Sequence, residues 1–388
     1  MQQRTVIQRP RLIAEIMRSI RESPVTALLG ARQTGKTTLS AMLAEKRSDT
    51  HFFDLEKAAD RSSLSTPETT LDSLRGLIII DEIQRMPLLF ATLRPLVDRH
   101  PLPARFLLLG SASPAMVKGV SESLAGRVLF IQVPGFTIDE VNSGFINRLW
   151  IRGGFPRSFL AKSEAESFRW RQAFLTTFLE RDIPQLGIRV PAETLRRFWM
   201  MLAHYHGQIW NSSELARSLG TNEKTTRHYL DILTGAYVMR VLPPWHENVG
   251  KRQVKSPKIY VRDSGLLHTL LGLENIQDIR AHPKYGLSWE GFALQQTLAL
   301  IKEDNAFFWA THRGAELDLL VIRHGKRYGF EFKCADAPTM TKSLHIAVKD
   351  LNLIRTWIVY PGDRRYPVHE SVEVIPLRCL TDALDMLQ

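Results

Sequence analysis

Continuous apolar runs and amphipathic stretches alternate along the first third of the chain. The apolar runs at 25–29, 77–80 and 106–109 lack the two-residue alternation of a half-exposed strand, so they predict buried parallel strands. The stretch 6–21 has helical spacing, with apolar residues at Leu12, Ile13, Ile16 and Ile20. The other elements expected here are a strand at 51–55 and helices at 38–45, 57–74 and 88–99. This alternation predicts an α/β domain whose parallel sheet is covered by helices on both faces.

The first apolar run leads into a sequence that fits the phosphate-binding pattern G-x-x-x-x-G-K-[ST]. Its glycines let backbone N–H groups close around phosphates, and the N-terminus of the following helix adds partial positive charge. Lys36 can reach the β and γ phosphates, and the Thr37 hydroxyl can ligate Mg²⁺. The alternative is a glycine-containing loop with a chance lysine, which the flanking strand and helix disfavour. The predicted nucleotide-binding residues are Gly30, Ala31, Arg32, Gln33, Thr34, Gly35, Lys36, Thr37 and Thr38.

Two carboxylates, Asp81 and Glu82, end the strand expected at 77–81. Open α/β sheets place their chemistry at the C-terminal ends of such strands. Asp81 would hold Mg²⁺ through water, and Glu82 would polarise the attacking water. The alternative is a strand that ends in a solvated acidic turn. Together with the phosphate loop, the pair predicts Mg²⁺-dependent hydrolysis of a nucleoside triphosphate, with ATP and Mg²⁺ as the cofactors.

Composition narrows the classes of partner. The chain has 388 residues and a formal net charge of +11, which favours polyanionic partners over a neutral surface. The sequence contains no run of eighteen apolar residues, so we expect no membrane span. The first residues also lack a secretory apolar segment. Cys334 and Cys379 are the only cysteines, too few for a disulfide framework or a zinc set. We therefore expect a cytoplasmic protein with no membrane partner.

Four short motifs of the first domain resemble one family. They are Gly-x-Arg-Gln-x-Gly-Lys-Thr-Thr-Leu at 30–39, Ile-Asp-Glu-Ile-Gln at 80–84, Leu-Gly-Ser at 109–111 and Ser-Leu-Ala-Gly-Arg at 123–127. They are similar to the bacterial and archaeal AAA+ ATPases that carry a C-terminal domain long described as of unknown function. The resemblance implies that Ser111 is the sensor 1 residue and that Arg127 is an arginine finger given to a neighbouring subunit. The alternatives are a strand-end cap for Ser111 and a structural ion pair for Arg127.

The same resemblance implies a homo-oligomeric ring of six subunits with active sites at the subunit interfaces. No clear Gly-Ala-Arg sensor 2 motif follows the core, and this departure leaves the lid and the hexamer open.

Residues 193–262 have a different pattern. Three helical segments at 193–205, 212–219 and 222–234 precede two expected strands, which is the outline of a winged helix-turn-helix. The third helix would read DNA, and the loop between the strands would be a basic wing reaching phosphates. The alternative is a protein-interaction or lid module. The predicted DNA-binding residues are Lys224, Arg227, Lys251, Arg252 and Lys255.

A hairpin is expected near the C-terminus. Strands at 316–322 and 328–333 flank His324-Gly325, a plausible two-residue turn. If 323 pairs with 326, Asp318 lies opposite Glu331 and Glu316 lies opposite Lys333, all on one face. Leu317, Leu319, Phe330 and Phe332 would then point to the other face.

Such an acid cluster needs a cation or shifted pKa values. Asp318, Glu331 and Lys333, with the helical Glu290, resemble the PD-(D/E)xK nuclease signature. The resemblance implies that the acids bind a divalent metal and that Lys333 supports the attacking water or the transition-state charge. The alternatives are a solvated charged face and a degenerate nuclease fold used only for binding.

These expectations divide the chain into four parts: an AAA+ core at 1–142, a helical connector at 143–192, a winged helix at 193–270 and a nuclease-like domain at 271–388. The leading hypothesis is an ATP-driven motor that processes DNA, with branched or forked DNA as one candidate substrate and a nuclease activity left open. The second is an ATP-gated regulatory or protein-remodelling ATPase whose terminal domain is catalytically silent.

Overall fold

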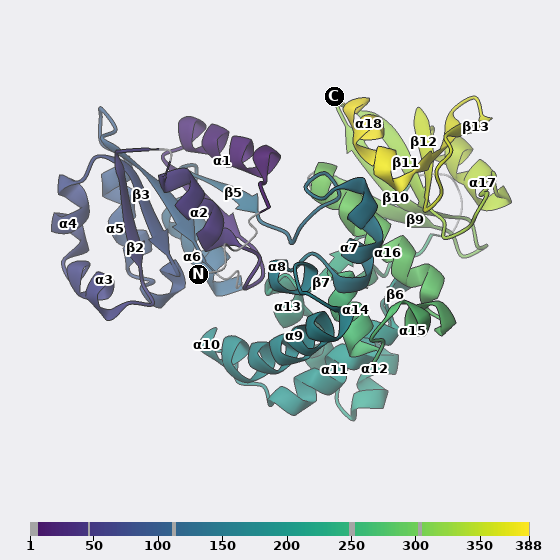
Figure 1. Ribbon diagram of the computed structural model, residues 1–388, viewed down its shortest axis with the longest axis horizontal. Coiled ribbons are helices and arrows are strands. Elements are labelled where there is room, and N and C mark those ends of the chain that lie inside the picture. The colour runs from purple at the N-terminus through teal and green to yellow at the C-terminus, as the bar shows by residue number, and fades with distance from the viewer. Residues whose placement is uncertain (1–6, 46, 111–113, 248–252, 302–304, 388) are drawn as a thin grey trace. The chain divides into compact units, whose positions relative to one another are not determined.

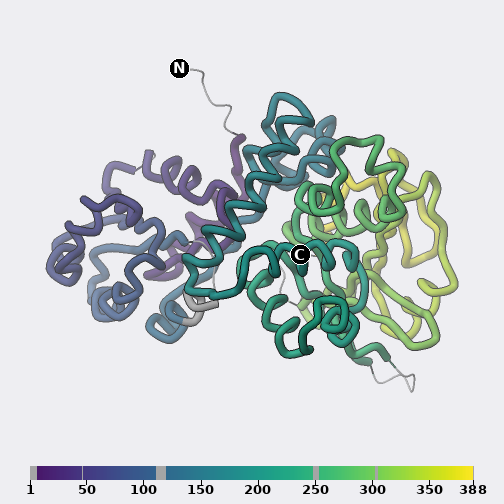
Figure 2. The backbone as a smooth tube through the Cα atoms, turned by 90° about the horizontal axis from the view of Figure 1, so that it is seen from below, coloured from purple at the N-terminus to yellow at the C-terminus, as the bar shows by residue number. Residues whose placement is uncertain are grey.

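The computed structural model describes residues 7–45, 47–110, 114–247, 253–301 and 305–387. The chain forms two compact units. The first runs to Gly135 and includes 235–237, and the second comprises 136–234 and the chain from 238 onward. The three regions expected after the ATPase core thus form one unit, and the first unit ends before the expected boundary at 142. Figure 2 follows the backbone from the purple N-terminus to the yellow C-terminus.

The first unit is built on a five-stranded sheet in the order β2-β3-β4-β1-β5. All of its neighbouring strands run parallel (Figure 1). The central strands are fully buried or nearly so, as their continuous apolar runs predict. The strands are β1 (Val25–Leu29), β2 (Thr50–Asp54), β3 (Gly76–Asp81), β4 (Ala104–Leu109) and β5 (Val128–Gln132).

Helices cover both faces of this sheet. Leu12, Ile16 and Leu39 pack with apolar side chains of one face, and Leu71, Leu89 and Val120 pack on the other. The expected helix at 57–74 is two separate helices. The helices of this unit are α1 (Pro10–Glu22), α2 (Lys36–Ala44), α3 (Ala58–Ser63), α4 (Pro67–Ser73), η1 (Ile83–Arg85), α5 (Leu89–Val97) and α6 (Pro114–Ser123).

The second unit begins with helices packed around a buried arginine. Arg171 is completely buried, and its guanidinium donates to Ser167 Oγ at 2.7 Å and Thr269 Oγ1 at 2.7 Å. Gly153 lies so close to Asp263 that a Cβ would meet its Oδ1 at 2.1 Å. The helices at the start of this unit are η2 (Ser143–Phe145), α7 (Ile146–Arg152), α8 (Pro156–Phe159), α9 (Glu164–Thr177), the π-helix η3 (Phe178–Asp182) and α10 (Ile183–Gln185).

Three helices and a small sheet follow. The helices α11 (Ala192–His204), α12 (Ser212–Leu219) and α13 (Glu223–Gly235) lie within a residue or so of their expected positions. Gly220 makes the turn after α12 in the left-handed conformation. The antiparallel strands β6 (Gln208–Ile209), β7 (Met239–Leu242) and β8 (Lys258–Val261) form a sheet in the order β6-β8-β7.

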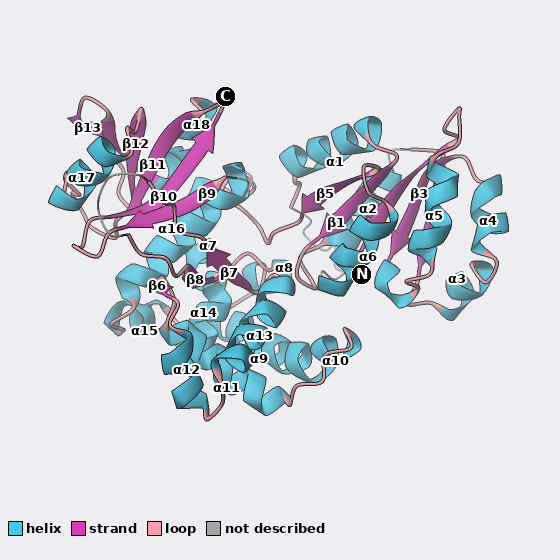
Figure 3. Cartoon of the chain, turned by 180° about the vertical axis from the view of Figure 1, so that it is seen from behind, coloured by secondary structure: helices cyan, strands magenta, loops and turns pink. Residues whose placement is uncertain are grey.

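A six-stranded sheet completes the second unit, in the order β13-β14-β12-β11-β10-β9 (Figure 3). It is mixed, because β12 runs parallel to both of its neighbours. Its strands are β9 (Ala306–Ala310), β10 (Glu316–Arg323), β11 (Lys326–Phe332), β12 (Arg355–Tyr360), β13 (Tyr366–His369) and β14 (Val372–Pro376). The helices of this part are α14 (Ser264–Leu270), α15 (Ile276–Ala281), α16 (Tyr285–Ile301), α17 (Lys342–Asp350), η4 (Leu377–Cys379) and α18 (Leu380–Asp385).

Candidate nucleotide site and acidic cluster

The phosphate loop joins β1 to α2 through a tight, glycine-dependent path. A Cβ at Gly30 would meet the carbonyl oxygen of Val133 at 2.4 Å, so a side chain there would push the loop away from the end of β5. Gly35 and Gln33 have φ values of 96° and 65°, in the left-handed region that favours glycine. The loop therefore has a fixed shape before the helix begins at Lys36.

Lys36 lies inside this loop. Its Nζ donates to the carbonyl oxygens of Gly30 at 3.0 Å and Ala31 at 2.8 Å. Burial lowers the pKa of Lys36 to about 8, although Glu82 and Asp81 favour its charged form. A buried ammonium group at this position can bind the phosphate oxygens of a nucleotide, because the anion would offset the cost of burying the charge.

Thr37 and Asp81 join the loop to the end of β3. Thr37 Oγ1 donates to Asp81 Oδ2 at 2.7 Å, across a sequence separation of 44 residues. Burial raises the pKa of Asp81 despite this hydrogen bond. A hydroxyl and a carboxylate in contact are the hard oxygen donors that Mg²⁺ prefers, so these residues fit the ion that the sequence predicts.

Glu82 follows with an unusual backbone. Its φ of 56° and ψ of 41° place a non-glycine residue in the left-handed region. The Nε2 of Gln84 donates to Glu82 Oε2, and Arg32 of the phosphate loop lies 3.8 Å from the same oxygen. Burial raises the pKa of Glu82, and the charge of Arg32 opposes that shift. The predicted base thus lies beside the phosphate loop.

Sequence patterns did not identify Arg9, whose side chain joins the phosphate loop to the segment that follows β5. The side chain is 3% exposed and donates to the carbonyl oxygens of Pro134 at 3.2 Å and Gly135 at 3.0 Å. It also reaches the carbonyl oxygen of Thr34 at 3.4 Å. An arginine just before a helix that starts at Pro10 carries no periodic signal, so only the tertiary structure shows this role.

The first unit matches a known family of domains. A family model described as an AAA domain matches residues 22–142. Uncharacterized proteins of Mycobacterium tuberculosis (Rv2008c) and Mycobacterium bovis (Mb2031c) are each 50% identical to the chain over 371 residues, covering 96% of this chain and 84% of theirs. The chain belongs to their family, an AAA+ family of P-loop ATPases. Two models of domains of unknown function, DUF8612 and DUF4143, match residues 145–277 and 285–380 of the ATPase.

Solved structures resemble the ATPase only distantly. The Walker-type ATPase PABY2304 of Pyrococcus abyssi is 15% identical with a TM-score of 0.47, and the match covers 69% of this chain and 96% of that one. RuvB of Thermotoga maritima is 15% identical with a TM-score of 0.29, covering 61% and 90% respectively.

Of the predicted catalytic residues Ser111 and Arg127, the structure describes only Arg127. Ser111 lies outside the described residues. Arg127 makes a two-pronged ion pair with Asp98, with Nε 2.6 Å from Oδ1 and Nη2 2.8 Å from Oδ2. Its carbonyl oxygen accepts from the N–H of Val25, the first residue of β1, whereas the phosphate loop follows the last residue of β1. Arg127 therefore lies at the end of the sheet opposite its own phosphate loop.

The predicted DNA-binding residues that the structure describes are exposed. Lys224 and Arg227 lie on α13, where Arg227 pairs with Asp231 at 3.0 Å, and Lys255 lies before β8. Lys251 and Arg252 lie outside the described residues.

The C-terminal hairpin has the predicted register. Arg323 pairs with Lys326 and Leu319 with Phe330, while His324 and Gly325 form the turn with φ values of 50° and 73°. The paired backbone ladder ends at Leu319. Beyond it, the N–H of Phe332 donates a hydrogen bond to the side-chain Oδ2 of Asp318 at 3.0 Å. Asp318 and Glu331 thus lie together where the two strands separate.

The expected strict alternation along β10 is wrong in one respect. A bulge in its pairing with β9 falls between Leu317 and Leu320, and these two residues pack in the same hydrophobic cluster. Uninterrupted alternation would place them on opposite faces. Asp318 lies within this bulge.

Two lysines neutralise this acidic cluster. Lys258 is a buried residue of β8. Its ammonium group donates a hydrogen bond to Glu316, and its Nζ lies 3.6 Å from Asp318 Oδ1. Lys333 Nζ lies 2.8 Å from Glu331 Oε1. Burial opposes the charge on Lys258, yet Tyr260, Asp318 and Glu316 raise its pKa overall. The sequence predicted Lys333 here but not Lys258, which reaches the cluster from a different sheet.

The three acids predicted as metal ligands lie near one another, and their charges interact. Burial and the charge of Asp318 raise the pKa of Glu331 to about 8 and that of Glu290 to about 7. Within the described ranges, no group of three His, Cys, Asp or Glu side chains is arranged to hold a metal ion. The role of Glu290, Asp318 and Glu331 as metal ligands stays a prediction, and in the structure Lys258 and Lys333 lie beside these acids.

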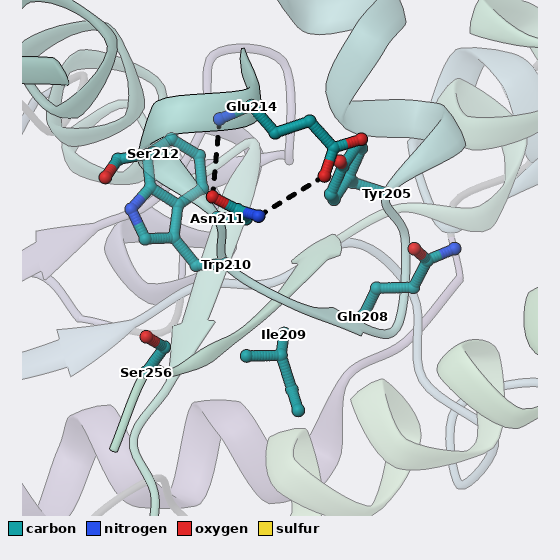
Figure 4. Close-up of a pocket in the computed structure, with 8 residues that line it drawn as sticks. All are labelled: Tyr205, Gln208, Ile209, Trp210, Asn211, Ser212, Glu214 and Ser256. Carbon is teal, nitrogen blue, oxygen red and sulfur yellow. Dashed lines mark hydrogen bonds between the residues drawn. The ribbon is translucent and has the colours of Figure 1, made fainter. Parts of the chain in front are cut away.

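A polar pocket lies beside the start of α12 (Figure 4). Asn211 accepts from the N–H of Glu214 at 3.3 Å, and its own amide donates to the Glu214 carboxylate at 3.3 Å. Burial and a hydrogen bond with Glu214 raise the pKa of Tyr205 to about 12. These contacts join Asn211, Glu214 and Tyr205, and Asn211 caps α12. No helix among the described residues is long and apolar enough to span a membrane.

Proposed function

We propose that this ATPase hydrolyses ATP with Mg²⁺ and uses the cycle to act on DNA. The observation that carries the proposal is the contact between Thr37 and Asp81, which brings the phosphate loop and the strand-end acids into one site. A nucleotide on the loop would have its phosphates beside Lys36, with Glu82 at the next position along the chain after Asp81.

In this proposal each residue has a separate task. Lys36 binds the β and γ phosphates, and Thr37 and Asp81 hold Mg²⁺. The ion would offset the charge that develops on the phosphate oxygens. Glu82 accepts the proton of the attacking water, and Ser111 orients that water or the γ-phosphate.

The assignment of DNA rests on charge and local fold. The order helix, strand, helix, helix, strand, strand, with β6 and β7 on either side of β8, is typical of a winged helix-turn-helix. Its third helix α13 presents Lys224 and Arg227 to solvent, and the chain carries a net charge of +11. Branched or forked DNA is the substrate that we propose.

We also propose a homo-oligomer, hexameric by family resemblance, in which Arg127 serves a neighbouring subunit. The position of Arg127 at the far end of its own sheet supports action in trans, and its pairing with Asp98 supports the structural alternative. Assembly would have to exchange Asp98 for the neighbour's phosphates. Mixing Arg127→Ala and Lys36→Ala subunits should restore ATP turnover at some interfaces if Arg127 acts in trans.

A second candidate function is an ATP-gated regulatory ATPase with a silent nuclease-like domain. The observation that favours it is Lys258, whose ammonium group occupies the place beside Asp318 and Glu316 where a metal would be expected. Under the first function the same cluster cuts DNA when it binds Mg²⁺ or Mn²⁺. Incubation of the full chain with Mn²⁺ and forked DNA distinguishes the two, with Asp318→Ala as the control.

The test of the central chemistry is Glu82→Gln. The amide cannot accept a proton at neutral pH, so this variant should bind ATP with unchanged affinity and hydrolyse it at least about 100-fold more slowly. Turnover at the wild-type rate would remove Glu82 from its role.

A further inference from the structure

The carboxylate of Glu82 is held on one side only. Gln84 Nε2 donates to Oε2, and Arg32 Nη2 lies 3.8 Å from that same oxygen. Among the described residues no hydrogen bond reaches Oε1. The two oxygens of one carboxylate therefore differ, one anchored and one available.

The backbone makes this arrangement specific. Glu82 adopts φ 56° and ψ 41°, a left-handed conformation that is strained for a non-glycine residue. Its N–H donates to Asp81 Oδ1 at 2.9 Å, and its carbonyl oxygen accepts from the N–H of Arg85 at 2.9 Å. These bonds fix the turn into η1, so Gln84 is brought back over the carboxylate two residues before it.

The second anchor comes from the phosphate loop itself. Arg32 is the third residue of that loop, and its side chain is only 16% exposed beside a Glu82 side chain that is 19% exposed. In so sheltered a place an ion pair is screened less than at the open surface. The loop that would hold the phosphates is thus in direct electrostatic contact with the group that would activate the water.

We propose that Gln84 and Arg32 are positioning residues that hold Oε2 of Glu82 and leave Oε1 to take the proton of the attacking water. The inference rests on the proposed role of Glu82. In the step, a proton passes from water to Oε1, the water oxygen bonds to the γ-phosphorus, and the bond from that phosphorus to the bridging oxygen breaks. ADP leaves with the bridging oxygen, and inorganic phosphate is formed.

The experiment is a double-mutant cycle in the full chain, with ATP and Mg²⁺. Gln84→Met keeps the volume but cannot donate, so kcat should fall about 10- to 100-fold, as expected for a misaligned base, while KM stays within about twofold. In the Glu82→Gln background the same substitution should cause no further loss, since Gln84 acts only through Glu82. Arg85→Met, which alters the next side chain of η1 and its pair with Glu56, is the matched control and should behave as wild type.

Other outcomes overturn the inference. An equal loss in both backgrounds would mean that Gln84 acts by another route, and an unchanged or raised kcat in Gln84→Met would mean that it does not position the base. Normal turnover of Glu82→Gln alone would instead reject the proposed function. If Gln84→Met does not fold, Arg32→Met and Arg32→Lys carry the test: lysine should restore part of kcat, whereas a change in KM alone for both variants would contradict the role of Arg32.

Discussion

The nucleotide site and the C-terminal cluster both gather carboxylates at the ends of strands, but their partners differ. Asp81 accepts a hydrogen bond from a neutral hydroxyl, and Lys36 bonds to carbonyl oxygens of its own loop. Asp318 and Glu331 instead lie beside the ammonium groups of Lys258 and Lys333. The acid of the first site thus contacts a neutral hydroxyl, whereas the acids of the second site contact ammonium groups. The two groups of strand-end acids thus differ in whether a cationic side chain already contacts them.

The largest expected effect falls on the nucleotide site. Lys36→Ala removes the buried ammonium group that would meet the phosphates, so the affinity for ATP should fall more than about 100-fold, the cost of an unpaired phosphate charge. Titration with a fluorescent ATP analogue measures the loss. Lys57→Ala, at an exposed lysine that pairs with Asp54 at 3.5 Å, is the control and should bind normally. Equal affinity in all three proteins would contradict the assignment of the loop.

The C-terminal cluster should respond in stability instead. Lys258→Met leaves Glu316 and Asp318 without their buried partner, which should lower the free energy of unfolding by about 2 kcal/mol. The effect is below that of a fully buried pair because the Glu316 side chain is 41% exposed and screened by water. Urea unfolding measures it, with the exposed Lys255→Met expected within about 0.5 kcal/mol of wild type. A Lys258→Met protein as stable as wild type would show that the ion pair is not structural.

Acid should weaken the second unit through two buried histidines. Burial lowers the pKa of both His206 and His268 to about 3, so the folded state keeps them neutral while the unfolded state protonates them below about 6.5. Their contribution is therefore complete above pH 6.5 and is lost as the pH falls toward 3, by up to about 1.4 kcal/mol per pH unit for each group. Urea unfolding at pH 7 and pH 5 measures the change. A stability that does not fall over this range would contradict the burial of both rings.

The smallest effect concerns the DNA surface. Lys224→Glu on α13 should weaken DNA binding equally for all sequences and reduce the slope of log affinity against log salt by about one. Fluorescence anisotropy at several salt concentrations measures the slope. Glu193→Lys, a charge change on α11, is the control. A sequence-dependent loss would mean that Lys224 reads bases and does not contact phosphate.

The two sites also differ in how far the sequence could predict them. Residues 30–38 are contiguous and Asp81 and Glu82 end a continuous apolar run, so the pattern alone predicts these residues as one site, and the structure brings Thr37 and Asp81 into contact. The hairpin register followed from the His324-Gly325 turn in the same way. Lys258 reaches Asp318 across 60 positions of sequence, which no periodicity encodes. The contacts of Arg32 and Gln84 with the Glu82 carboxylate depend on side-chain rotamers and on the positive φ of Glu82, which are properties of the folded chain.

Edge and bulge positions were the least predictable parts of the fold. The strand β5 was not expected, because its apolar residues Leu129 and Phe130 stay about 40% exposed at the sheet edge and resemble an ordinary connection. The bulge between Leu317 and Leu320 likewise leaves no signal in the sequence, since it arises from the pairing with β9.

The central claim is that ATP hydrolysis at this site is coupled to DNA. The most direct measurement is the rate of ATP turnover by the full chain with Mg²⁺ at low salt, with and without a forked DNA duplex. The account predicts turnover that requires Mg²⁺, rises several-fold with DNA, and loses the rise when Lys224 and Arg227 are reversed to glutamate. Turnover that is the same with every DNA tested would contradict the coupling, and the absence of any turnover would contradict the assignment of the site.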